Sequence, residues 1–129
     1  MTLVTEDLRR PAWGCVHFVP AEKWKETMIA DRYVAELDGT DFTSKEAAIS
    51  AIARAFDFPD DFGRNWDAVE DYLRDLSWLP ASGYVLIVRN ARMAWVNATL
   101  LAGTLTNIWL VAAEFWARRN VSFHLVWLV

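Results

Sequence analysis

The sequence predicts an α/β fold in which helices pack against a small parallel sheet. Runs rich in strand-forming residues occur at 13–19, 32–37, 84–88 and 121–129. Helical patterns separate the second run from the third and the third from the last. Strands joined by helical crossovers pair in parallel and are buried on both faces of their sheet. The 129 residues, 54 % of them apolar, suit one domain with a modest core.

Residues 1–30 are interpreted as an N-terminal extension to a main domain at 31–129. Within the extension, WGCVHFV at 13–19 has the composition of a strand, so the extension could add one strand to the sheet. Residues 21–30 show no decisive period. RYVAEL at 32–37 is the first strand expected in the main domain, and the turn signal Asp38-Gly39 follows it.

Two amphipathic helices are predicted between the strands at 32–37 and 84–88. Thr43 and Glu46 have the spacing of a capping box, and the first helix should end before Pro59. Asn65 is a good N-cap for the second helix, and Gly63 before it is expected to take a positive φ. The inward row of the second helix consists of Trp66, Val69, Leu73 and Leu76.

An uncharged stretch of 21 residues at 93–113 is long enough to cross a bilayer. Its Asn, Thr and Gly residues lower its mean hydropathy, and Gly103 has the features of a break between two shorter helices. We therefore predict two buried helices, near 91–101 and 104–118, in preference to a membrane span.

Negative charge is concentrated in one short segment. Residues 57–75 contain seven acids against Arg64 and Arg74, which gives a local charge of −5. The whole chain has a net charge of −4, so the remainder sums to +1. Such asymmetry favours a cationic partner and argues against nucleic acid, whose phosphates would be repelled.

The acids form a row on the predicted second helix. Asp67 and Asp71 lie four residues apart and therefore on one face, which Asp75 is expected to continue. The helix dipole accounts for Asp67 in the first turn but not for the later acids. Like charges four residues apart cost a few tenths of a kcal/mol, roughly 0.2–0.5, so the row suggests a use in binding. A simple solvated face is the alternative.

The stretch FGRNWDAVEDYL at 62–73 resembles the signature of the barstar family, the intracellular inhibitors of barnase-type ribonucleases. In that family an aromatic-Gly-x-Asn stretch opens the second helix, and an Asp-Ala pair and a further Asp follow. The residues that match this pattern are Gly63, Asn65, Asp67, Ala68, Asp71 and Leu73. The order of elements also agrees from about residue 32 to the C-terminus.

The resemblance implies a barstar-like fold of three parallel strands packed with about four helices. It also implies that the second helix and the preceding loop fill the active site of a basic, secreted-type ribonuclease in a 1:1 complex. Asp71 would occupy a phosphate position and Asp67 would be the second acid, while Glu114 corresponds to a further acid only with a one-residue insertion. The partner-binding residues implied in this way are Asp60, Asp61, Phe62, Gly63, Arg64, Asn65, Asp67, Glu70, Asp71, Arg74 and Glu114.

The chain would then be a cytoplasmic immunity protein rather than an enzyme. We expect no cofactor, no metal, no membrane, no nucleic acid and no small-molecule substrate. The sequence departs from the family pattern at several positions. Glu70 replaces a Trp, Tyr72 replaces a Cys, Arg64 replaces an acid, and Asp61 replaces the first of two aromatic residues. The contact surface is therefore more acidic and less aromatic than the family pattern.

The residues leave two other classes of function open. The eight Trp residues are compatible with an adaptor or interaction domain. Asp61, Asp67 and Asp71 could instead hold a hydrated divalent cation for hydrolysis, although a convex helix face is an unusual place for such a site.

The histidines and the cysteine do not predict a metal centre. His17 and His124 are 107 residues apart, and neither has a Cys, His or acid nearby at ligand spacing. Cys15 is the single cysteine, so no intramolecular disulfide can form, and we expect it to be a small core residue. The first residues lack the apolar region of a signal peptide, which favours a cytosolic location.

Overall fold

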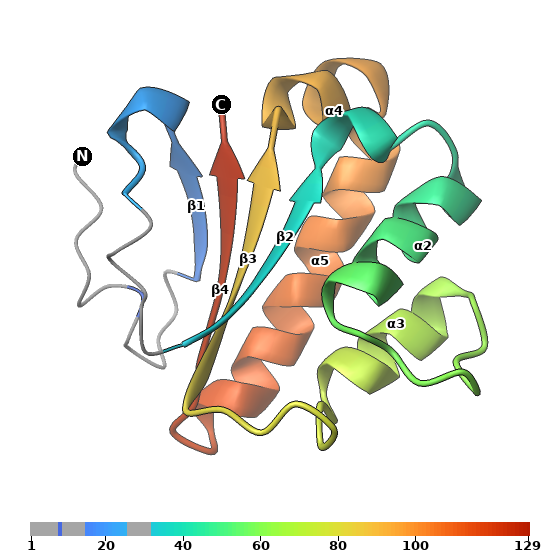
Figure 1. The fold of residues 1–129 in the computed structure, drawn as a ribbon, viewed down its shortest axis with the longest axis vertical. Helices are drawn as coiled ribbons and strands as arrows, with labels where there is room; N and C mark the ends of the chain where they lie inside the picture. Colours follow the sequence, from blue (N-terminus) through green and yellow to red (C-terminus); the bar gives the residue numbers. More distant parts are fainter. Residues whose placement is uncertain (1–7, 9–14, 26–31) are drawn as a thin grey trace.

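The computed structural model describes residue 8, residues 15–25 and residues 32–129. Within these residues, four strands form one parallel sheet in the order β1-β4-β3-β2. In Figure 1 the helices α2, α3 and α5 lie on one side of this sheet. The strands are β1 (Val16–Val19), β2 (Tyr33–Asp38), β3 (Gly83–Arg89) and β4 (Ser122–Leu128).

The α/β class and the parallel sheet predicted from the sequence are confirmed, and β1 adds the expected fourth strand beside β4. The helices are α2 (Lys45–Ala55), α3 (Trp66–Leu73), α4 (Ala91–Asn97) and α5 (Thr99–Ala117), with short 3-10 helices η1 (Ala21–Lys23) and η3 (Gly39–Asp41). Residues 21–30 had no clear prediction, and of these 26–30 lie outside the described residues. The division of the chain into 1–30 and 31–129 stays a prediction.

The N-cap of α2 is Ser44 and not Thr43. The Ser44 hydroxyl accepts a hydrogen bond from the backbone N–H of Ala47 at 3.0 Å. The helix ends before Pro59, as predicted, because the chain turns through Asp57 with a φ of 51°. The loop that leads to α3 begins at this left-handed residue.

The break between the last two helices falls at Ala98 and not at Gly103. Ala98 leaves the helical region, with a φ of −142° and a ψ of 50°. Gly103 lies inside α5, where it costs only about 1 kcal/mol relative to Ala. Tertiary packing of the helix easily offsets this cost, so the glycine does not interrupt it.

Among the described residues, α5 is the one helix long and apolar enough to cross a membrane by length and composition. In this structure its inner face packs against the sheet. The residues that it buries there are Ala102, Leu105, Ile108, Trp109, Ala112 and Ala113. Two helices are present where two were predicted, but α4 ends at Asn97 and α5 begins at Thr99, earlier than the predicted start near 104.

Two tryptophans of α5 connect it to the rest of the core. The Trp109 ring stacks on Phe123 of β4 with 4.0 Å between centroids, and its Nε1–H donates to the Phe123 carbonyl oxygen at 3.2 Å. The Trp116 Nε1–H donates to the carbonyl oxygen of Leu73 at 2.7 Å. The second contact holds the C-terminal end of α3 against α5.

The two histidines lie side by side, which the sequence pattern did not predict. The Nε2 atom of His17 lies 2.9 Å from the Nδ1 atom of His124, and the rings stack with 5.1 Å between centroids. Parallel pairing of β1 and β4 unites residues that are 107 positions apart. Among the described residues no group of three or more potential metal ligands occurs.

Candidate partner-binding surface

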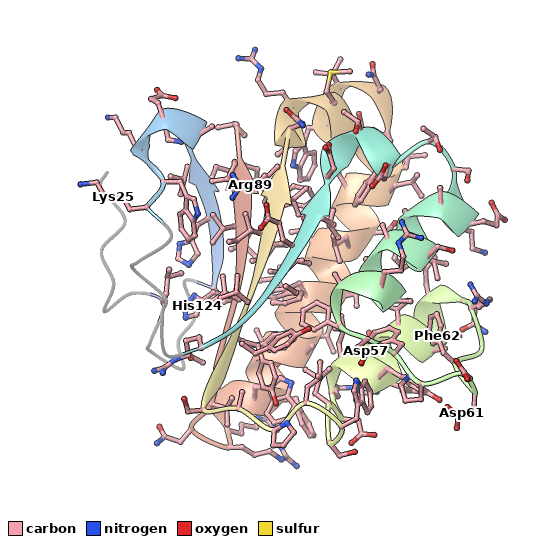
Figure 2. The ribbon with its side chains drawn as sticks, in the orientation of Figure 1. Lys25, Asp57, Asp61, Phe62, Arg89 and His124 are labelled. Carbon is pink, nitrogen blue, oxygen red and sulfur yellow. The ribbon has the colours of Figure 1, made fainter. Side chains whose placement is uncertain are left out.

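The loop at 57–65 and helix α3 bring most of the acids to one surface. Asp60, Asp61, Asp67 and Asp71 are exposed, and the side chain of Asp71 is 67 % exposed. Figure 2 shows Asp57 and Asp61 on the helical side of the molecule, opposite His124 on the sheet. We call these four carboxylates and the residues between them the acidic surface.

Asn65 starts α3 as the sequence predicted. Its Oδ1 atom accepts a hydrogen bond from the backbone N–H of Ala68 at 2.8 Å. Its Nδ2 donates to the carbonyl oxygen of Gly63 at 3.3 Å, so the same side chain also shapes the end of the loop. Asp67 lies in the first turn, where the positive end of the helix dipole favours a carboxylate.

The positive φ before α3 belongs to Arg64 and not to Gly63. Arg64 has a φ of 54°, and none of the described glycines has a positive φ. A Cβ on Gly63 would meet Ala68 and Asn65 at 3.6 Å, an ordinary contact distance. The expectation for Gly63 is therefore wrong, and contacts within the chain do not require a glycine there. The exposed Arg64 carries the strain, about 1–2 kcal/mol for a residue with a Cβ.

Four aromatic rings hold the loop against α3, and we call them the aromatic cluster. The Phe58 ring centroid lies 4.8 Å from Phe62, 5.4 Å from Tyr72 and 5.9 Å from Trp78. The Trp78 Nε1–H donates to the carbonyl oxygen of Phe56 at 2.9 Å. The cluster thus joins the loop, the helix and the segment that follows the helix, and it limits the movement of the acids that they carry.

Phe62 was predicted to contact a partner, but its side chain is only 8 % exposed. Its ring packs on Phe58 and Tyr72, because burial of a large aromatic surface is favourable. Phe62 therefore anchors the loop in this structure, and its place among the partner-binding residues stays a prediction.

Sequence reasoning missed Tyr72, whose hydroxyl donates to the Oδ1 atom of Asp61 at 2.8 Å. This hydrogen bond raises the pKa of Tyr72, because only the protonated phenol can donate it, and the negative charge of Asp61 acts in the same direction. The only signal in the sequence was the tyrosine itself at a position where the family pattern has a cysteine.

Arg74 forms ion pairs with two acids of α3. Its Nη2 atom lies 2.9 Å from Oδ1 of Asp71 and 3.6 Å from Oε2 of Glu70, which is half-buried. The pairs have the i,i+4 and i,i+3 spacing at which opposite charges meet on a helix. Exposed pairs of this kind contribute about 0–1 kcal/mol.

Asp75 was expected to continue the row of acids, but α3 ends at Leu73. Leu76 turns the chain with a φ of 50°, and its backbone N–H donates to the carbonyl oxygen of Tyr72 at 3.2 Å. The Asp75 carboxylate instead accepts a hydrogen bond from the N–H of Ser77 at 3.3 Å. The helical row thus consists of Asp67 and Asp71.

Glu114 lies on α5, away from the loop in sequence. Its Oε1 atom pairs with Nη2 of Arg118 at 2.7 Å, one turn further along the same helix. Both side chains are exposed. Its ion pair is thus with its own helix, and its place among the partner-binding residues stays a prediction.

A family model described as Barstar (barnase inhibitor) matches residues 32–127 of the chain. The match begins immediately before β2, ends within β4 and includes all of the acidic surface. It leaves out β1, which precedes the matched residues and pairs with β4. No curated protein matches the chain.

Proposed function

Because the chain belongs to the barstar family of barnase inhibitors, we propose that its acidic surface blocks the active site of a barnase-type ribonuclease. The family match covers 96 of the 129 residues. Proteins of this family are intracellular inhibitors and not enzymes, which removes the metal-dependent hydrolase from the alternatives.

The observation that best supports this mechanism is the pair of exposed carboxylates, Asp67 and Asp71, on one face of a helix anchored at both ends. An active site that cleaves RNA is lined with cations that hold phosphate. A rigid set of carboxylates offers these cations the same charge without a bond that can be cleaved. We assign Asp71 to a phosphate position and Asp67 to the second acid.

The other residues of the surface are proposed to support these two acids. Asp60, Asp61 and Glu70 extend the negative field, and Asn65 fixes the start of the helix. Packing within the chain does not require a glycine at position 63. Gly63 is therefore proposed to let the partner approach the backbone of the loop closely. Arg64 and Glu114 are proposed to lie at the edge of the contact in a 1:1 complex.

Association with the ribonuclease should slow steeply as salt rises. Between about 50 and about 500 mM NaCl we expect the association rate constant to fall at least about tenfold, because mobile ions screen the attraction between exposed charges. Stopped-flow mixing with a catalytically inactive ribonuclease measures this rate, and titration gives the stoichiometry. An association rate that does not respond to salt would contradict electrostatic docking of the acidic surface.

Replacing Arg74 by Gln should accelerate association by about two- to threefold. The variant frees Asp71 from its ion pair and makes the charge of residues 57–75 more negative by one. Arg54→Gln, an exposed position on α2, is the matched control because it removes the same charge elsewhere. Equal acceleration in both variants would show that only net charge matters. Slower association of the Arg74 variant would mean that Arg74 holds Asp71 in its binding position.

A further inference from the structure

We propose that Tyr72 is a positioning residue for partner binding, because its hydroxyl holds the carboxylate of Asp61 at the edge of the acidic surface. This inference rests on the proposed function but concerns a side chain that the family resemblance does not assign to the contact. The geometry that carries it is the hydrogen bond from the Tyr72 hydroxyl to Oδ1 of Asp61, 2.8 Å long, between helix α3 and the loop that precedes it.

Asp61 is an exposed acid in the loop between α2 and α3. An exposed aspartate in a loop samples several rotamers, and each one must be given up when a partner binds. A hydrogen bond from a fixed donor removes part of this freedom before binding. The Asp61 carboxylate therefore samples fewer positions before the ribonuclease binds.

The Tyr72 hydroxyl is a fixed donor because its ring is held on three sides. The ring centroid lies 5.4 Å from both Phe58 and Phe62 and 5.5 Å from Trp78. Its backbone belongs to α3, directly after Asp71. Tyr72 thus links the loop acid Asp61 to the helix that presents Asp71, which limits changes in the spacing of the two carboxylates.

The hydrogen bond also keeps its donor at neutral pH. Asp61 raises the pKa of the Tyr72 phenol, so the hydroxyl keeps the proton that it donates. Phenylalanine at this position would keep the ring contacts and lose only the donor. Tyr72→Phe is therefore a specific probe of the proposed role.

The first test uses the free protein. With ¹³C at the tyrosine Cζ, NMR follows the titration of Tyr72 in the wild-type chain and in Asp61→Ala. We expect a lower pKa of Tyr72 in the variant, because the acceptor and its charge are gone. Tyr84 is an internal control in the same spectra, since its hydroxyl donates to the carbonyl oxygen of Leu79 at 2.6 Å. An unchanged Tyr72 titration would overturn the proposed hydrogen bond.

The second test is a double-mutant cycle with the ribonuclease. We expect Tyr72→Phe to weaken binding by about three- to tenfold and to have little effect when Asp61 is already Ala. Tyr33→Phe is the matched control, because it also removes one hydroxyl, one that donates to the carbonyl oxygen of Ala55. It should bind as the wild type does.

The outcomes separate the inference from the proposed function. Additive effects of Tyr72→Phe and Asp61→Ala would show that Tyr72 does not act through Asp61, and the inference would be wrong while the inhibitor function stands. Failure of the wild-type chain to bind any barnase-type ribonuclease would overturn the proposed function and this inference with it. Thermal melting of each variant verifies that binding is measured on folded protein.

Discussion

Replacing Asp71 by Ala is expected to weaken inhibition of the ribonuclease by at least about thirtyfold, which corresponds to about 2 kcal/mol or more. In the complex this carboxylate would lie among the cations of the active site, away from water. Truncation of one member of such a charge pair costs about 2–5 kcal/mol, because the opposite charges stay buried without a partner. That general range includes measurements on barnase and barstar themselves.

Asp75→Ala is the matched control for Asp71→Ala. Both variants remove one carboxylate from the same acidic segment, so they reduce long-range attraction to a similar extent. Asp75 lies beyond the end of α3 and bonds to the N–H of Ser77, so we expect its loss to change inhibition by less than about threefold. Inhibition constants from a fluorogenic RNA cleavage assay decide between the two. Equal effects would mean that charge alone acts and that Asp71 has no specific place.

Trp109→Ala is expected to cause the largest loss of stability, about 3–5 kcal/mol of the free energy of unfolding. The Trp109 side chain is 0 % exposed, stacks on Phe123 and donates a hydrogen bond to the backbone of β4. Its removal leaves a cavity between α5 and the sheet. The melting temperature should fall by about 10–20 °C for a domain of this size.

Leu100→Ala tests the same helix at its exposed end. Leu100 is 86 % exposed, so its truncation should change the free energy of unfolding by less than about 0.5 kcal/mol. Chemical denaturation followed by circular dichroism measures both variants without relying on tryptophan fluorescence. Similar small effects of Trp109→Ala and Leu100→Ala would show that α5 does not pack on the sheet, and a membrane span would again need to be considered.

Much of the fold was predictable because its signals are local. The buried strands at 84–88 and 121–129 and the cap at Asn65 follow from short patterns of apolar and capping residues. Element ends were less predictable, as at Ala98 and Ser44, because the local preferences differ by only about 1 kcal/mol. Packing against the sheet easily exceeds such differences.

The candidate site was predictable in its charge but not in its contacts. The acids at 57–75 follow directly from the sequence. Asp67 and Asp71 lie on one face of α3, as the helical period of 3.6 residues requires. The burial of Phe62 and the left-handed φ of Arg64 were not predicted, because both depend on how the loop packs on α3.

The sequence by itself determined the order of strands and helices and the place of the acidic segment, because periodicity, capping and charge act between residues close together in the chain. Only the tertiary structure decided that His17 meets His124 and that Tyr72 holds Asp61. These contacts depend on which strands become neighbours and on the rotamers that a packed core allows. Patterns between residues close together in the chain do not specify strand neighbours or core rotamers.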